Sequence, residues 1–176
     1  MKRICKDTCI ARDFFFTNRG GYGKKEVTEA LKGEHIMDYR KFGDTYIVRI
    51  DRGEEILSSL TALCDRENIR LASVEALGAI DHAVVCVYDV PTKTFYRKEF
   101  NEPMEISSLC GTVTRKEGKV YIHLHATLCD KDLLAHGGHA NELRVSATCE
   151  MVVRTIPGEV DRKLDDQTGL NVFLFS

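Results

Sequence analysis

Three histidines in one stretch of the chain have the types and the spacing of a metal site. The stretch covers residues 119–139 and reads KVYIHLHATLCDKDLLAHGGH. On a β-strand, residues two apart face the same side, so His123 and His125 are expected to project together. His139 follows after a turn, and the glycine pair before it lets the backbone approach closely and bring the third imidazole near the first two. Three imidazoles leave one coordination position open, which is typical of a catalytic or ligand-accepting zinc site.

Other interpretations of these residues stay open. An H-x-H pair also occurs on polar sheet faces where the histidines only make hydrogen bonds. Zinc is the best match for imidazole ligands, although copper or nickel suits the same donors in vitro. Glu75, His82 and Glu142 are candidates to support the ligands, and Glu75 or Glu142 is the candidate general base of an enzyme. The sequence has no G-x-S-x-G, P-loop or dinucleotide-binding glycine motif.

The elements that would position these histidines are mostly strands. Apolar residues alternate with polar ones, and turn residues such as Pro91, Pro103 and Gly118 separate the runs. Short connections favour hairpins over helical crossovers. Besides the earlier run Thr45–Ile50, the expected strands are Leu71–Leu77, Ala79–Val90, Thr94–Phe100, Met104–Thr114, Val120–Leu128, Leu143–Thr155 and Asn171–Phe175.

One amphipathic helix is expected near the start of this region. Apolar residues recur at helical spacing from Ile56 to Glu67, with charged residues between them. Asp51 is the expected N-cap, with Glu54 at the spacing of a capping box. The predicted fold class is therefore α+β: a curved, mostly antiparallel sheet with one or two packed helices.

Charge divides the chain into two unlike parts. The whole sequence of 176 residues has 25 basic and 27 acidic residues. Residues 1–35 hold eight basic and five acidic residues, whereas residues 36–176 hold 17 and 22. We interpret residues 1–36 as an N-terminal arm or upstream extension and residues 37–176 as one domain. The acidic domain argues against DNA binding by bulk electrostatics and leaves the basic arm as the segment to contact nucleic acid.

Seven cysteines point to a reducing compartment. Their number is odd, and no C-x-x-C pair occurs among them. This pattern favours reduced thiols in a cytoplasmic protein over a disulfide framework. No apolar run is long enough to span a membrane, so no membrane contact is expected.

Four motifs in order resemble the PPC domain, the plants and prokaryotes conserved domain, whose family label includes DNA binding. They are SVEALGAIDHAVVCVYD, MEISSLCGTVTRKEGKVYIHLHATLCDKD, LLAHGGH and DRKLDDQTGLNVFLF. The resemblance implies a homotrimer with a metal site at His123, His125 and His139. Land-plant members carry AT-hooks and a partner-binding hexapeptide. This chain has no R-G-R-P core, and only Glu105 and Ile106 match the hexapeptide.

Two functions from different classes follow. The first is a trimeric PPC-domain binding or regulatory protein, DNA-associated through its family label, with a histidine metal site. The second is a zinc-dependent enzyme acting on a small molecule. A third, structural alternative is a histidine cluster between subunits whose protonation below about pH 6 loosens the trimer.

Overall fold

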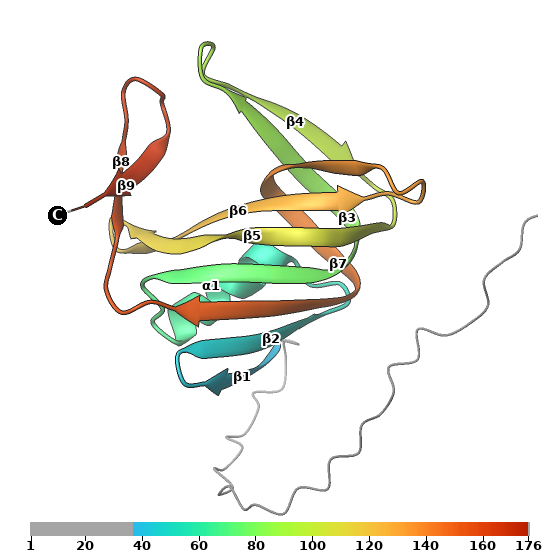
Figure 1. Ribbon diagram of the computed structural model, residues 1–176, viewed down its shortest axis with the longest axis horizontal. Helices are drawn as coiled ribbons and strands as arrows, with labels where there is room; N and C mark the ends of the chain where they lie inside the picture. Colours follow the sequence, from blue (N-terminus) through green and yellow to red (C-terminus); the bar gives the residue numbers. More distant parts are fainter. Residues whose placement is uncertain (1–36, 176) are drawn as a thin grey trace, which may run out of the picture. The chain divides into compact units, whose positions relative to one another are not determined.

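The computed structural model describes residues 37–175, and the predicted N-terminal arm lies outside these residues. The described chain forms nine strands and one α-helix (Figure 1). In chain order they are β1 (Asp38–Phe42), β2 (Thr45–Asp51), α1 (Ile56–Arg66), β3 (Ala72–Asp89), β4 (Thr94–Phe100), β5 (Met104–Lys116), β6 (Lys119–Cys129), β7 (Ala135–Thr155), β8 (Asp161–Leu164) and β9 (Asn171–Leu174).

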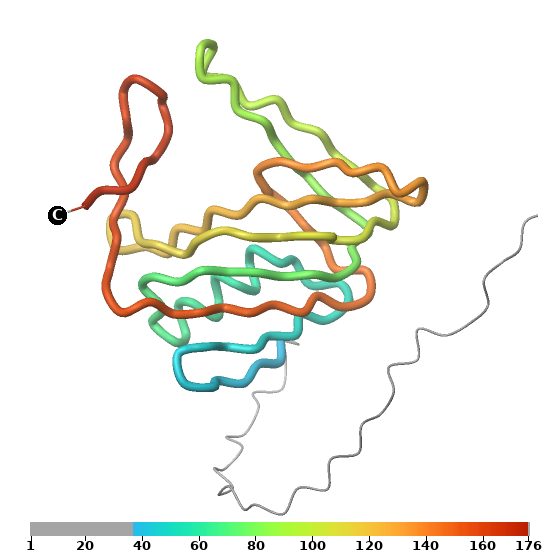
Figure 2. Tube along the Cα trace, viewed as in Figure 1, coloured from blue at the N-terminus to red at the C-terminus, as the bar shows by residue number. Residues whose placement is uncertain are grey.

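Seven strands form one sheet in the order β1-β2-β7-β6-β5-β3-β4, and every pairing is antiparallel. β7 also pairs with β3, so these two long strands join both halves of the sheet. The trace in Figure 2 shows the sheet curving at the bends of these two strands. The α+β prediction with a curved antiparallel sheet is confirmed, with one helix within the described residues.

Two predicted strand boundaries are wrong because long strands bend instead of ending. The predicted break at Gly78 lies inside the continuous strand β3, where the register with β5 and β7 shifts. A Cβ at Gly78 would collide with the backbone of Thr148 and Cys149, so β7 can pass closely here only because the residue is glycine. β7 begins at Ala135, eight residues before the predicted Leu143, and therefore carries His139 itself.

Helix α1 packs its apolar face on the sheet. Ile56, Leu60 and Leu63 are fully buried and belong to the main core. The predicted N-cap is wrong: Glu55 caps the helix, and its carboxylate accepts hydrogen bonds from the backbone N–H groups of Leu57 and Ser58. The predicted capping residue lies too early because a further turn separates β2 from the helix.

A buried arginine closes the other end of α1. Arg115 from β5 donates to the carbonyl of Ile69 at 2.7 Å and to that of Cys64 at 3.5 Å. Carbonyl groups at a helix C-terminus have no helical partner, and a cation near them is favourable. Arg115 thus fastens the end of the helix to the sheet.

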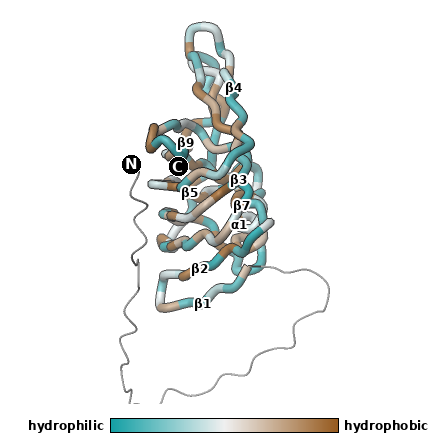
Figure 3. Tube along the Cα trace, turned by 90° about the vertical axis from the view of Figure 1, so that its right-hand side faces the viewer, coloured by the Kyte–Doolittle hydropathy of each residue, from teal (hydrophilic) through white to brown (hydrophobic). Residues whose placement is uncertain are grey.

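Two hairpins extend from the rest of the fold and meet each other. One is formed by the end of β3 with β4, and the other by β8 with β9 (Figures 1 and 3). The Tyr88 hydroxyl donates to the Thr168 carbonyl at 2.7 Å, and Lys93 Nζ donates to the Asp166 carbonyl at 2.8 Å. The two hairpins therefore meet through side chains and backbone, although they are far apart in sequence.

No helix within the described residues has the length and apolar character needed to cross a membrane. The five cysteines in the same part of the chain are free thiols: Cys64, Cys86, Cys110, Cys129 and Cys149. Burial raises the pKa of the Cys64 thiol, and that of Cys149, to about 12, which fits small core residues and not reactive groups.

Candidate metal centre

Strand β6 presents two histidines on the face opposite the core. Leu124, Ala126 and Leu128 are buried, while His123 is half-buried and His125 is exposed. This is the alternation expected for a strand with one face packed on the core. The sequence prediction for the two faces of this strand is confirmed.

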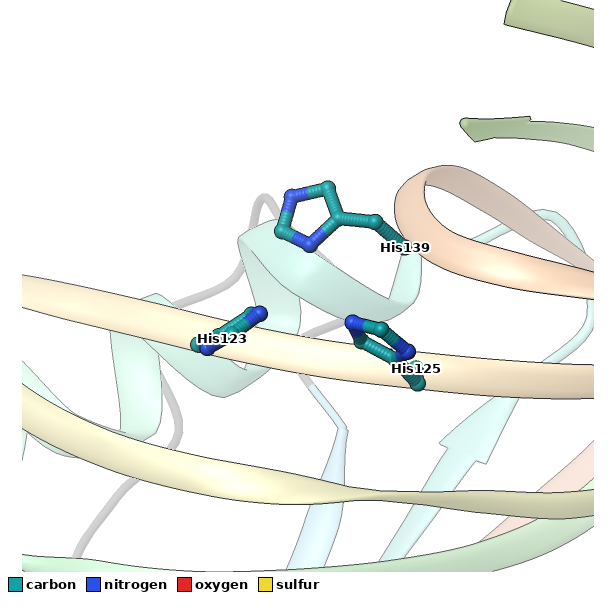
Figure 4. Close-up of side chains that lie close together, drawn as sticks. All are labelled: His123, His125 and His139. Carbon is teal, nitrogen blue, oxygen red and sulfur yellow. The ribbon is translucent and has the colours of Figure 1, made fainter. Parts of the chain in front are cut away.

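His139 joins them from β7. His125 and His139 are directly opposite each other in the β6–β7 pairing, so their side chains share one face. The ring of His139 lies 5.0 Å from that of His123 and 5.7 Å from that of His125, centroid to centroid. One nitrogen from each of the three rings lies within 4.8 Å of the others. Figure 4 shows the three side chains around a common space.

The glycines around the site permit these close approaches. A Cβ at Gly111 of β5 would collide with the carbonyl group of His123 in the neighbouring strand. A Cβ at Gly138 would collide with the backbone of Cys86 in β3. Both glycines are therefore needed for the strands that carry the histidines to pack at their observed separation.

The electrostatics favour neutral imidazoles. Burial, with a contribution from the neighbouring histidines and Arg162, lowers the pKa of His123 to about 4. Burial and the proximity of His125 also lower the pKa of His139. Neutral imidazole is the form that binds a metal ion. At neutral pH, His123 and His139 therefore do not have to release a proton before they bind one.

The donor set fits a zinc ion. Zinc bound by histidine has Zn–N distances of about 2.0–2.1 Å, which places tetrahedral ligand nitrogens about 3.4 Å apart. The observed separations between the three nitrogens are all within 4.8 Å, somewhat wider than this value. The residues that would hold the ion are His123, His125 and His139, and a fourth position remains for a ligand.

Arg162 lies beside the centre and was missed by the sequence analysis. The central carbon of its guanidinium group lies over the rings of Tyr121 and Phe173, 4.3 and 4.6 Å from their centroids. It donates to Thr114 Oγ1 at 2.7 Å and to the Asn171 carbonyl at 2.9 Å. The arginine stands in the predicted motif DRKLDDQTGLNVFLF, but β8 is only four residues long and gives no periodicity from which to infer its role.

Glu75 lies on the same face as the histidines but not among them. Cys110 is the cross-strand partner of His125, and Glu75 is in turn the partner of Cys110. Glu75 is therefore two strands from His125. It lines a shallow groove of about 440 Å³ together with Cys110, Leu77 and Glu150.

His82 and Glu142 form a pair of their own. His82 Nε2 lies 3.5 Å from a Glu142 carboxylate oxygen, and Arg97 reaches the other oxygen at 3.5 Å. Hydrogen bonding to Asn101, at 2.7 Å, and to Glu142 raises the pKa of His82. Neither residue belongs to the three-histidine cluster.

The remaining predicted residues lie at other places on β5. Glu105 is exposed, whereas Ile106 is 2% exposed and packs in the main core. Only Glu105 of this pair offers its side chain to a partner.

His136 of β7 is close to His139 in sequence but does not belong to the three-histidine cluster. Its Nε2 atom lies 2.9 Å from a carboxylate oxygen of Asp130.

Several solved structures are similar to this chain. A protein from Bacteroides thetaiotaomicron, named a "putative DNA-binding protein", is 33% identical over 80% of this chain and 99% of its own, with a TM-score of 0.78. One of the same name from Ralstonia eutropha is 31% identical over 78% of this chain and 96% of its own, with a TM-score of 0.73. A metal-containing protein from Archaeoglobus fulgidus is 33% identical over 81% of this chain and 100% of its own, with a TM-score of 0.72.

No curated protein matches the chain. The family model described as the Plants and Prokaryotes Conserved (PCC) domain matches residues 37–157, which include all three histidines and the whole of the main sheet. This is the PPC family that the sequence motifs resemble. The chain belongs to the plants and prokaryotes conserved domain family.

Proposed function

We propose that this protein is a cytoplasmic, homotrimeric binding or regulatory protein of the PPC family whose three-histidine centre holds a zinc ion. The observation that carries the proposal is the convergence of His123, His125 and His139 from two paired strands. The metal-containing relative from Archaeoglobus fulgidus supports it. The bound ion supplies a Lewis-acidic position that an exchangeable ligand occupies.

Metal analysis tests this proposal. The full chain, purified without a histidine tag and supplied with zinc, is expected to retain about one ion per chain by elemental analysis. The variant His123→Ala is expected to lose it, because the two imidazoles that remain, His125 of β6 and His139 of β7, are too few ligands to retain zinc. His82→Ala is the matched control, since His82 lies outside the cluster. A native protein that retains no metal would contradict the proposal.

The trimer rests on the family resemblance and on exposed apolar residues of the sheet. Phe42, Ile47 and Leu77 are 64%, 48% and 57% exposed. Apolar groups on an outer sheet face are typical of surfaces covered by another subunit. Light scattering is expected to give a mass of three times 19.9 kDa, and a mass of a single chain would contradict the trimer.

DNA association enters from the names of two relatives. The excess of acidic residues in 36–176 disfavours direct contact between this domain and phosphate groups. We therefore assign any DNA contact to the basic residues 1–35 or to a partner protein. The proposed metal binding by the three histidines does not depend on DNA binding.

A zinc-dependent enzyme acting on a small molecule is the second candidate. The open coordination position favours it. The two candidate general bases lie away from the three histidines. Glu142 is paired with His82 and Arg97, and Glu75 is two strands from His125. A ligand-binding centre therefore fits the described residues better than a hydrolytic one does.

A further inference from the structure

Arg162 is a buried cation without an acidic partner. Its side chain belongs to a residue that is 7% exposed, and its hydrogen bonds to Thr114 Oγ1, Thr112 Oγ1 and the Asn171 carbonyl all go to neutral acceptors. Within residues 37–175, no carboxylate lies within ion-pair distance of it. A buried charge without a counter-charge is unfavourable, so an anion that docks here would be stabilised.

The guanidinium group keeps donors available. It has five N–H groups, and its three hydrogen bonds in the described chain use one from each nitrogen. Each terminal nitrogen retains a second N–H. The rings of Tyr121 and Phe173 pack against the group, with centroids 4.3 and 4.6 Å from its central carbon, and these contacts leave the second N–H groups unused. Donors at the edge of a planar guanidinium group match the two oxygens of a carboxylate.

This edge lies beside the metal centre. Thr112, which accepts from Arg162 at 3.4 Å, is the cross-strand partner of His123. The positive charge of Arg162 is also close enough to contribute to the lowered pKa of His123. The backbone carbonyl of Asn171 accepts from Arg162, and the buried side-chain oxygen Oδ1 of the same asparagine has no hydrogen-bond partner. A buried acceptor needs a donor such as a water molecule, so the case for an anion rests on the unpaired guanidinium group of Arg162.

We propose that the open position of the metal centre takes a small carboxylate anion whose negative charge is also held by Arg162. The inference rests on the proposed function, because one carboxylate oxygen replaces the exchangeable ligand of the ion. A divalent ion with three neutral imidazoles and a neighbouring guanidinium group is a strongly positive site. An anion offsets this charge, whereas a neutral ligand does not.

Spectroscopic titration tests the inference on the full chain. Cobalt(II) takes the place of zinc and gives visible absorption bands that change when the open position is filled. Malonate is expected to change these bands in the native protein. In Arg162→Gln its dissociation constant is expected to rise about tenfold or more, because a charge-assisted hydrogen bond is lost. Arg97→Gln is the control, because Arg97 is an exposed arginine outside the cluster.

A second variant covers the case in which Arg162→Gln does not fold. Asn171→Asp places a carboxylate beside Arg162 and keeps the stacked guanidinium group, and it is expected to weaken malonate binding to a similar extent. Unchanged malonate affinity in the folded variants, or a native cobalt form that does not respond to malonate, would overturn the inference. Inorganic phosphate is titrated in parallel, and tighter binding of phosphate than of malonate would overturn the assignment to a carboxylate. A native protein that takes up no cobalt would instead contradict the proposed function.

Discussion

At the scale of single residues, the centre depends on histidines that stay neutral. The pKa of His123 is about 4 in the folded chain, against about 6.5 for an unperturbed histidine. The main cause is burial, and the neighbouring imidazoles and Arg162 add to it. The metal-free protein must therefore lose stability when these imidazoles are protonated.

The first prediction concerns this pH dependence. Because the folded-state pKa lies below that of the unfolded chain, the neutral form of His123 stabilises the fold above about pH 6.5. This contribution is lost as the pH falls from about 6.5 to about 4. Urea unfolding of the metal-free protein is expected to show a steeper decline in this range than His123→Gln does. Parallel declines in the two proteins would contradict the assignment.

At the scale of elements, the two faces of strand β6 were predictable from the sequence, whereas contacts between elements distant in sequence were not. Its alternation is local, so the sequence placed His123 and His125 on one face. Arg162 approaches Thr114 across 48 residues of chain, and nothing near either residue signals the contact. The pairing of His82 with Glu142 likewise depends on the register between β3 and β7.

The second prediction concerns the spacing of β5 and β6. Gly111→Ala places a Cβ against the His123 carbonyl, so the two strands must separate. We expect a loss of about 1–3 kcal/mol in the free energy of unfolding, together with weaker zinc binding. Gly118→Asn is the control, because a Cβ there meets nothing and asparagine tolerates its positive φ of 78°. Equal zinc affinity in both variants would contradict the role of Gly111.

The third prediction concerns the end of helix α1. Arg115→Met keeps most of the apolar volume but leaves the carbonyl groups of Ile69 and Cys64 without this donor. We expect a loss of about 2–4 kcal/mol in the free energy of unfolding, measured in urea. Arg144→Ala removes an exposed ion pair with Asp81 and is expected to change stability by less than about 1 kcal/mol. A similar effect of both substitutions would show that Arg115 does not secure the helix.

At the scale of the whole molecule, charge decides which partners fit. The excess of acidic over basic residues in 36–176 is five per chain, and a trimer multiplies it by three. A trimer with this excess of negative charge repels the DNA backbone unless its basic residues gather on one face. A metal ion held by the three neutral imidazoles would, by contrast, be a local positive site that suits a small anion.

The fourth prediction follows from this charge. The full chain is expected not to retard duplex DNA in a gel-shift titration at about 150 mM salt, because few phosphate contacts are available to release counterions. Measurement at about 50 mM salt shows whether residues 1–35 provide a weak, salt-sensitive contact. Retardation that persists at the higher salt concentration would contradict the charge argument.

The sequence by itself determined the facing pair His123 and His125, the acidic character of the domain and the family. The first follows from the two-residue period of a strand, which is local, and the others from residue types and their order. Only the tertiary structure decided that His139 lies opposite His125, that Arg162 lies beside them and that Glu75 does not. Strand register and long-range contacts depend on how distant residues pack, because a shift of one residue would turn each side chain to the other face.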